Sequence, residues 1–324
     1  MNCAIIGAGQ LGSRHLQGLL TVQNQKLTIY IVDPSIDSIE IARQRANEIS
    51  HSHNLVFITS IEELAKELSF VVIATNSNVR YNVLKKLLET CSVNFLILEK
   101  VLFPKIQEYD DALELIKKSG TQCWVNHPRR LNNDYKKLKR YFDKDKTFSF
   151  QLVGASWGLA CNALHFIDFF EYLTDSSLTS MSCENLNPQP QESKRNGYIE
   201  FEGNILGKLS NNHVFSISSL PNDQIVQPSI SIMTDDFRIF IQEGGKSKIY
   251  LFLKEKNFEP ISLDMTIKFQ SQLTGLLFEQ LNQYNTCELP TLQHASKTHK
   301  LFIESLLNHW NKATGKQNIL LPIT

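Results

Sequence analysis

One short segment limits the folds open to this chain more than any other. An apolar run at residues 2–7 ends in the glycine spacing GAGQLG, and an amphipathic stretch follows from residue 11 to about residue 22. A strand that turns through glycines directly into a helix is typical of a βαβ unit. The free N–H groups at the start of such a helix attract an anion. The segment therefore predicts a nucleotide-binding turn.

Strands and helices then alternate as far as about residue 125. Strand-like runs lie at 27–32, 55–58, 70–75, 94–98 and 122–125, and helical patterns lie at 35–49, 60–68, 78–89 and 105–119. This alternation predicts an α/β fold, a doubly wound parallel sheet or Rossmann domain over residues 1–125. Ligands bind such sheets at the carboxyl ends of the strands, so the polar residues there form the candidate site.

The ends of the first, second and fourth strands carry the candidate cofactor contacts. The backbone of the glycine turn is expected to bind a pyrophosphate, and its residues are Gly7, Ala8, Gly9, Gln10, Leu11 and Gly12. Asp33 is expected to accept hydrogen bonds from the adenosine ribose. Its carboxylate would repel a 2′-phosphate, so we predict NAD, with NADP as the alternative. Thr75 and Asn76 are expected on the nicotinamide side, where they can also cap the next helix.

The end of the fifth strand carries a charged pair, Glu99 and Lys100. Lys and Glu are seldom buried unless paired, so burial alone does not explain them. We expect both residues at the cofactor, with Lys100 facing the crevice. A solvated loop is the alternative.

The pattern changes from about residue 126. Helical stretches lie at 132–142, 159–173, 266–284 and 291–313, and strand-like runs lie at 147–156, 197–201, 205–218, 229–234, 237–242 and 248–253. Strands without intervening helices predict an open, mostly antiparallel sheet. We therefore expect an α+β domain for substrate binding and oligomerisation over residues 126–324, whose final helix can return to the first domain.

Charge and composition argue against several partners. Lys plus Arg and Asp plus Glu are 33 each, so no basic excess indicates a nucleic acid. No apolar run approaches the roughly 20 residues that span a membrane. The six cysteines have no C-x-x-C spacing, so we predict no metal site. The N-terminus lacks a signal-peptide pattern, and we expect a cytoplasmic protein.

Taken together, several motifs resemble the glucose-fructose oxidoreductase, inositol dehydrogenase and MocA (Gfo/Idh/MocA) family. They are GAGQLGSRH at 7–15, VVIATNSN at 71–78, LEK at 98–100, the arginine pair in NHPRRLNNDYKKLK at 126–139, and CNALHFIDFF at 161–170. The resemblance covers nearly the whole chain. It implies an NAD(P)-dependent dehydrogenase or reductase that acts on a CH–OH group of a sugar or sugar nucleotide. The last motif is similar to a branch linked to bacterial surface carbohydrates.

The resemblance also implies two catalytic residues, Lys100 and His165, and two departures from the family pattern. Val101 replaces a proline that often follows a cis peptide bond, which leaves the backbone conformation there open. Cys161 stands where an aspartate usually precedes the histidine by four residues. The assisting aspartate is therefore missing, whereas Asp168 matches the end of the motif.

The candidate substrate contacts gather around the same helix. They are Arg129, Trp157, Cys161, Asn162 and Asp168. Steps of four and three residues place Cys161, His165 and Asp168 on one helix face. Arg129 would bind an anionic group or form a salt bridge, and Trp157 would stack on a sugar ring or pack in the core. Taken alone, a histidine on an oily helix is more often a core residue.

Three functions remain open. The first is a sugar or sugar-nucleotide oxidoreductase, and the second is a regulatory protein that binds a dinucleotide but has lost catalysis. The second is favoured by Val101 and Cys161. The third is an enzyme that reduces an imine or another unsaturated bond, against which Lys100 and His165 argue mildly. For each we expect a homo-oligomer, a dimer or tetramer formed through the open sheet.

Overall fold

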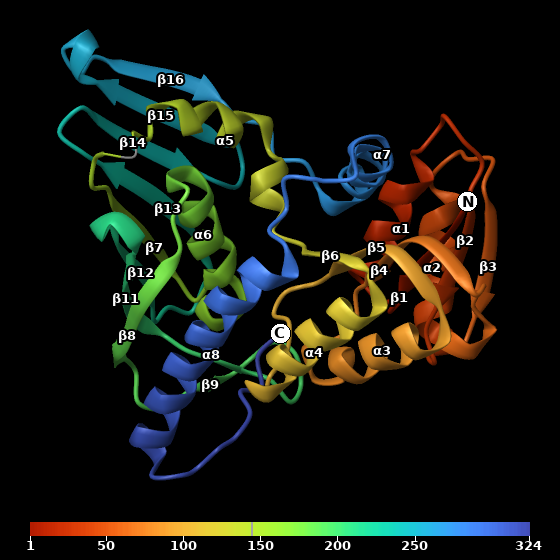
Figure 1. Cartoon of the computed structure of the whole chain (residues 1–324). Coiled ribbons are helices and arrows are strands. Elements are labelled where there is room, and N and C mark those ends of the chain that lie inside the picture. The colour runs from red at the N-terminus through yellow and green to blue at the C-terminus, as the bar shows by residue number, and fades with distance from the viewer. Residues whose placement is uncertain (144) are drawn as a thin grey trace. The chain divides into compact units, whose positions relative to one another are not determined.

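The computed structural model describes residues 1–143 and 145–324, which form two compact units (Figure 1). The first unit comprises Met1–Leu131 and Lys268–Ser296, and the second comprises Asn132–Ile267 and Lys297–Thr324. In the described part of the chain, no helix has both the length and the apolar character that crossing a membrane requires. The functional division expected at residues 125 and 126 stays a prediction.

The first unit contains a six-stranded sheet in the order β3-β2-β1-β4-β5-β6. Its strands are β1 (Asn2–Ile6), β2 (Thr28–Val32), β3 (Asn54–Ile58), β4 (Glu67–Ile73), β5 (Ser92–Leu98) and β6 (Gln122–Val125). Every neighbouring pair is parallel. This order reverses direction between β1 and β4, which is the place where doubly wound sheets bind nucleotides. The predicted Rossmann fold is confirmed.

Helices cover both faces of this sheet. They are α1 (Gly12–Leu20), α2 (Ile36–Asn47), α3 (Ser77–Thr90), α4 (Gln107–Ser119) and α7 (Thr274–Tyr284). Helix α1 packs against α2 and α7, whereas α3 packs against α4, as Figure 1 shows for the last pair. Right-handed crossovers on the two sides of β1 place these groups on opposite faces.

The prediction of a helix at residues 60–68 is wrong. Only a 3₁₀ turn forms there, Ile61–Glu63, and β4 begins at Glu67. The backbone N–H of Ser60 donates to the Glu63 carboxylate at 3.1 Å, which closes a capping box around a single turn. Leu64 is already extended (φ −66°, ψ 152°), because the following apolar residues enter the buried sheet.

The second unit contains an eight-stranded sheet in the order β16-β15-β14-β13-β7-β12-β11-β8. The strands are β7 (Ser149–Ala155), β8 (Leu178–Leu186), β11 (Gly203–Leu209), β12 (Val214–Leu220), β13 (Val226–Met233), β14 (Phe237–Gln242), β15 (Lys248–Leu253) and β16 (Pro260–Asp264), and a separate hairpin joins β9 (Gln191–Glu192) to β10 (Ile199–Glu200). All neighbours in the large sheet are antiparallel except β7 and β12. The mostly antiparallel sheet is thus confirmed.

Three details of this sheet differ from the prediction, and one of them is strand β16 (Pro260–Asp264), which was not predicted. The run predicted at 205–218 is two strands, because a turn at Ser210–Asn212 places Asn211 and Asn212 at positive φ. Strand β8 was not predicted. Most of its side chains are exposed or half-buried, so its sequence has no apolar run.

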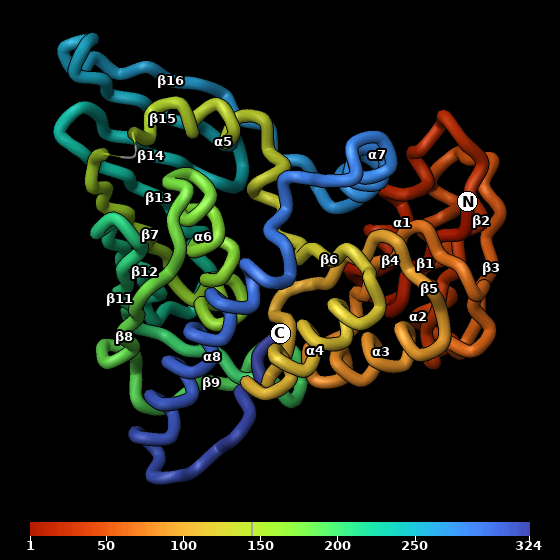
Figure 2. Tube along the Cα trace, in the orientation of Figure 1, coloured from red at the N-terminus to blue at the C-terminus, as the bar shows by residue number. Residues whose placement is uncertain are grey.

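One face of the large sheet is covered and the other carries exposed apolar side chains. The helices of this unit are α5 (Asn133–Leu138), α6 (Leu159–Thr174) and the part of α8 (Leu292–Thr314) from Lys297 onward, and their paths can be followed in the tube of Figure 2. The Phe150 ring of β7 stacks on Phe170 of α6 at 4.4 Å. The exposed apolar side chains of the other face include Val153, Leu206, Met233 and Phe240, each 36–46% exposed.

The second stretch of the first unit, Lys268–Ser296, completes its core. Helix α7 crosses α1 so closely that a Cβ on Gly275 would lie 2.4 Å from the Gly18 carbonyl oxygen. The Phe278 ring meets Phe70 of β4 edge to face at 5.5 Å. The N–H of Val125 in β6 donates to Pro290 O at 3.0 Å. The nucleotide-binding unit is therefore assembled from two stretches that lie far apart in the sequence.

Candidate cofactor and active site

The glycine turn after β1 combines two tight contacts with one open position. Gly7 has φ +93°, and a Cβ there would lie 2.8 Å from the backbone nitrogen of Thr75. A Cβ on Gly12 would lie 1.7 Å from the Gly7 carbonyl oxygen, so only hydrogen fits where α1 starts against β1. A Cβ on Gly9 would meet nothing within 4 Å. The turn is thus closed on the protein side and open above Gly9, where a pyrophosphate can approach the backbone.

Asp33 follows β2 and its carboxylate is held by two backbone N–H groups. Ala8 N–H donates to Oδ2 at 2.8 Å, and Ser35 N–H donates to Oδ1 at 2.9 Å. Asp33 therefore supports the glycine turn from the neighbouring strand. It remains half-buried and lies in the wall of the same cleft as Gly7 and Gly9.

This cleft has a volume of about 560 Å³ at the carboxyl ends of β1, β2 and β4. Its lining includes the predicted cofactor residues Gly7, Gly9, Asp33, Thr75 and Asn76. Of the other predicted cofactor residues in the described chain, Ala8, Gln10, Leu11, Gly12, Glu99 and Lys100 are not part of that lining. The structure thus brings the glycine, aspartate and threonine contacts together in one cavity.

The cleft fits a dinucleotide in its chemistry. The Thr75 hydroxyl oxygen is buried at the cleft and has no hydrogen-bond partner among the described residues. A buried hydroxyl without a partner is costly, so a ligand group that bonds to it would be favoured. The open space above Gly9 and the N–H groups at the start of α1 suit phosphate oxygens.

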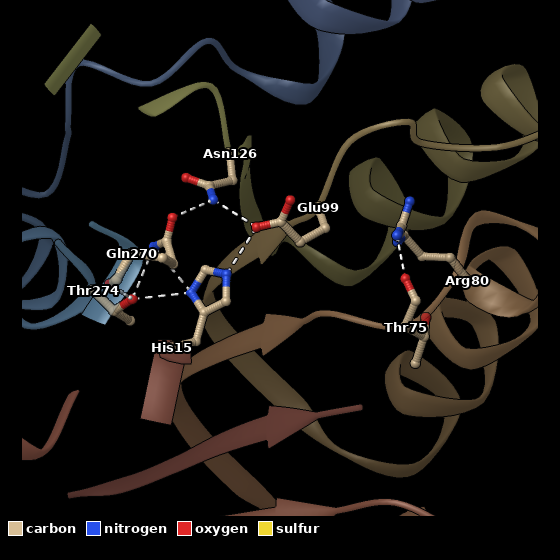
Figure 3. A network of polar contacts seen from close by, with 7 residues as sticks. All are labelled: His15, Thr75, Arg80, Glu99, Asn126, Gln270 and Thr274. Carbon is tan, nitrogen blue, oxygen red and sulfur yellow. Dashed lines mark hydrogen bonds and ion pairs between the residues drawn. The ribbon is translucent and has the colours of Figure 1, made fainter. Parts of the chain in front are cut away.

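A buried network lies beside the cleft and was not predicted (Figure 3). His15 Nε2 lies 2.8 Å from Glu99 Oε1, and the Asn126 side chain donates to the same oxygen at 2.6 Å. His15 Nδ1 lies 2.9 Å from the Thr274 hydroxyl, and Gln270 Oε1 accepts from Asn126 at 2.9 Å. The network joins α1, the end of β5, the end of β6 and the Lys268–Ser296 stretch. It fixes the glycine-turn helix to the loop that carries Lys100.

Glu99 is held in its charged form inside this network. Burial by itself would raise the pKa of Glu99, but the hydrogen bonds from His15 and Asn126 and the nearby charge of Lys100 hold that pKa below its ordinary value. Glu99 is 3% exposed, and its carboxylate bonds to His15 and Asn126 lie within the first unit. A cofactor contact by Glu99 stays a prediction, whereas its bonding within the unit is direct.

Lys100 is half-buried and its peptide bond to Val101 is cis. The sequence had left this backbone conformation open because valine replaces the family's proline. The three following side chains, Val101, Leu102 and Phe103, are fully buried. The lysine therefore lies between a buried carboxylate and a buried apolar segment, in a loop with little freedom.

The chain after β6 carries a buried histidine and two arginines. Burial and the neighbouring charge of Arg130 hold the pKa of His127 well below its ordinary value of 6.5, so the ring is neutral at neutral pH. Arg129 and Arg130 are half-buried in the 3₁₀ turn Pro128–Leu131. Substrate binding by Arg129 stays a prediction.

In the second unit, the N-terminus of α6 is held by a carboxylate from outside the helix. Glu200 Oε2 accepts from the Ala160 N–H at 2.8 Å, and Oε1 accepts from the Cys161 N–H at 3.2 Å. Gly158, at φ +79°, leaves space for this carboxylate, since a Cβ there would lie 3.2 Å from Glu200 Oε1. Glu200 was not singled out because it belongs to a different strand-like run, and only the fold brings it to the helix.

The candidate substrate residues of α6 differ in burial. Cys161, Asn162 and His165 are half-buried, whereas Asp168 is 3% exposed. The Asn162 amide donates to the carbonyl oxygens of Trp157 and Gly158, at 3.1 and 3.0 Å. The predicted helix over 159–173 is confirmed by α6, while the roles of these four side chains stay predictions.

Trp157 has the contacts of a core side chain. It is 7% exposed, its indole N–H donates to Ser218 O at 2.9 Å, and its ring meets Phe166 edge to face at 5.6 Å. The sequence had left a sugar-stacking role and a core role open. These contacts favour the core role.

Comparisons with known proteins agree with this geometry. Residues 1–127 match the sequence profile of the oxidoreductase family with an NAD-binding Rossmann fold, Gfo/Idh/MocA. No curated protein sequence matches the chain. The family binds NAD, which confirms the cofactor that the sequence predicted.

Solved structures extend the likeness in fold to nearly the whole chain. The UDP-N-acetylglucosamine 3-dehydrogenase of Acidithiobacillus ferrooxidans has a TM-score of 0.68 at 12% identity, covering 94% of this chain and 96% of that one. An oxidoreductase of Agrobacterium radiobacter, solved with NAD⁺ and L-tartaric acid, has a TM-score of 0.72 at 12% identity, covering 95% and 96%. The transcriptional regulator Gal80p of Kluyveromyces lactis has a TM-score of 0.71 at 15% identity, covering 96% of this chain and 92% of that one.

These likenesses concern the fold, and the sequence profile concerns the first unit. The glycine turn, Asp33 and Thr75 all lie within the matched residues and around one cleft. The chain is therefore similar, through residues 1–127, to the Gfo/Idh/MocA oxidoreductase family and its NAD-binding Rossmann fold.

Proposed function

We propose that this protein is a cytoplasmic NAD-dependent dehydrogenase or reductase that transfers a hydride to or from a sugar or sugar derivative in bacterial surface-carbohydrate metabolism. The observation that carries the proposal is the cleft of the first unit, where the open side of Gly9, the buried Thr75 hydroxyl and Asp33 meet. Lys100 follows the neighbouring strand β5 in a tightly held loop. A protonated amine beside a nicotinamide site suits a reaction at a carbinol or keto oxygen.

When bound, NAD⁺ supplies a hydride acceptor at its nicotinamide ring. In the oxidative direction the substrate carbinol loses a hydride from carbon and a proton from oxygen. We assign the proton to His165, whose ordinary pKa of about 6.5 suits transfer near neutral pH. Lys100 donates a hydrogen bond to the same oxygen and stabilises its developing negative charge. In the reductive direction His165 or Lys100 returns the proton.

Other side chains are proposed to hold the sugar. Arg129 suits an anionic group such as a phosphate or a carboxylate. The N–H groups of Asn162 already donate to backbone carbonyls, so a substrate hydroxyl would meet its Oδ1. Cys161 and Asp168 are proposed to shape the pocket around His165. A nucleotide sugar is the first substrate to try, because one protein of similar fold is a UDP-N-acetylglucosamine dehydrogenase by name.

The test is turnover of NAD⁺ or NADH with a panel of nucleotide sugars, free sugars and inositols, read as nicotinamide absorbance. Lys100→Ala and His165→Ala are expected to abolish turnover while calorimetry still detects NAD⁺ binding. Lys105→Ala and His309→Asn are matched controls, since Lys105 is exposed, His309 is half-buried like His165, and both lie outside the proposed site. Full activity in Lys100→Ala would overturn the assignment of Lys100.

A second function is kept because specific residues favour it. Val101 and Cys161 depart from the family's catalytic pattern, and a transcriptional regulator has a similar fold. In that case the protein binds NAD and responds to it without turning over a sugar. Tight NAD⁺ binding together with no turnover of any substrate in the panel would favour this regulatory function over the enzyme.

A further inference from the structure

Arg80 is a buried cation that the proposed mechanism does not use. It lies in the first turn of α3 and is 1% exposed. A positive charge in the first turn opposes the helix dipole, and burial removes the charge from water. Both effects disfavour an arginine at this position, so its surroundings must compensate for them.

The compensation comes from two loops. One guanidinium nitrogen of Arg80 donates to the Leu102 carbonyl oxygen at 3.0 Å and also to the Val101 carbonyl oxygen. The other nitrogen donates to the Thr75 carbonyl oxygen (Figure 3). Thr75 lines the cofactor cleft at the end of β4, whereas Val101 and Leu102 follow Lys100 at the end of β5. One side chain therefore spans the ends of two neighbouring parallel strands.

We propose that Arg80 is a positioning residue that joins the cofactor loop to the loop of Lys100, so that NAD bound against the first loop also fixes the second. The proposal rests on the function proposed for Lys100, because positioning matters only if that lysine acts. The planar guanidinium suits this role, since its rigid fork directs donors to separate acceptors at once. A lysine at the same position would offer one charged nitrogen and less fixed geometry.

A second contact shows where a loss of positioning would be seen. The Phe103 N–H is directed at the Tyr109 hydroxyl at 3.4 Å, and that hydroxyl donates to Phe103 O at 3.0 Å. Phe103 is fully buried directly after the two residues that Arg80 holds. Its amide should exchange slowly while the loop is held and faster when the loop is released.

The experiment is hydrogen exchange of the full chain, with and without NAD⁺, read by mass spectrometry over residues 74–78 and 99–104. In the natural protein NAD⁺ should slow exchange in both segments. In Arg80→Met it should slow only the first, and the second should exchange about tenfold faster with or without NAD⁺, because the two bonds donated to Val101 O and Leu102 O are lost. Arg80→Lys should restore part of the coupling.

Leu87→Ala is the matched control, since Leu87 is fully buried on the same helix and the change destabilises the unit without removing a donor. It should keep the coupled slowing of both segments. Equal NAD⁺-dependent slowing of residues 99–104 in Arg80→Met and the natural protein would overturn the proposal. If Arg80→Met does not fold, Arg80→Lys decides in the same way: full coupling in that variant overturns the need for a guanidinium.

Turnover separates this proposal from the proposed function. If a sugar is turned over, Arg80→Met should lower kcat about tenfold while the Kd for NAD⁺ changes less. If Lys100→Ala keeps full turnover, the catalytic assignment fails, whereas the exchange pattern still reports whether Arg80 joins the two loops. An unchanged kcat in Arg80→Met, with Lys100→Ala inactive, refutes the positioning role alone.

Discussion

Two glycines of the same turn should respond to alanine in opposite ways. A Cβ on Gly12 would lie 1.7 Å from the Gly7 carbonyl oxygen, whereas ordinary contacts begin at 3.4 Å. Helix and turn would have to separate by the difference, about 1.7 Å. Both contacting groups are backbone, so no side chain can rotate away, and overpacking of this kind costs about 3 kcal/mol or more. For a unit of this size that lowers the Tm by roughly 6–12 °C.

Gly9→Ala should leave the fold intact and weaken the binding of the cofactor. Its Cβ meets nothing within 4 Å, and its φ lies outside the left-handed region. Alanine there should keep or slightly raise stability, by about 0.4–1 kcal/mol, because the unfolded chain loses freedom. The added methyl occupies the space where pyrophosphate would approach, so the Kd for NAD⁺ should rise at least about tenfold.

Scanning calorimetry and NAD⁺ titration calorimetry measure both effects on the two variants. The expected pattern is a low Tm for Gly12→Ala and a normal Tm with weak NAD⁺ binding for Gly9→Ala. A Gly12→Ala protein with natural Tm and Kd would refute the packing argument. A Gly9→Ala protein that binds NAD⁺ normally would refute the placement of the pyrophosphate.

Three further predictions concern pH, the core and association. The pKa of buried His127 lies well below 6.5, so as the pH falls below 6.5 this residue takes up a proton in the unfolded chain before it does so in the folded chain. The free energy of unfolding should therefore drop by up to about 1.4 kcal/mol per pH unit below pH 6.5, and urea unfolding of His127→Gln should lack this pH dependence. Trp157→Phe removes the indole N–H that donates to the Ser218 carbonyl and should lower the free energy of unfolding by about 1–2 kcal/mol without changing KM. A raised KM would instead favour a contact between Trp157 and the substrate. Phe240→Lys places a charge on the exposed sheet face. If the natural protein forms the predicted dimer or tetramer through this face, light scattering should show a smaller assembly for the variant, and an unchanged mass would exclude this face.

The cofactor cleft was predictable from the sequence because its signals are local. The glycine spacing, the strand before it and Asp33 lie within one βαβ unit, so their relative positions follow from the fold class alone. The structure places Gly7, Gly9, Asp33, Thr75 and Asn76 around one cavity. Apolar runs identify the strands, and the carboxyl ends of parallel strands necessarily lie at the same edge of the sheet.

The buried network was not predictable because its partners lie far apart in the chain. His15 and Glu99 are separated by 84 positions, and His15 and Thr274 by 259. Nothing in a single sequence indicates which distant polar groups will pair when the core closes. Arg80 is a similar case, since its acceptors are backbone carbonyls that any residue provides. Strand β8 was missed for a different reason, its lack of an apolar run.

The division of the first unit into two stretches has a consequence for synthesis on the ribosome. Helix α7 supplies Gly275 against α1 and Phe278 against β4, and Thr274 reaches His15. All three are translated more than 140 residues after the last residue of the first stretch, Leu131. The nascent nucleotide-binding unit must therefore remain incomplete, with a helix-sized gap beside α1, while the Asn132–Ile267 stretch of the second unit emerges. A chain that stalls before residue 274 would expose that gap to chaperones and proteases.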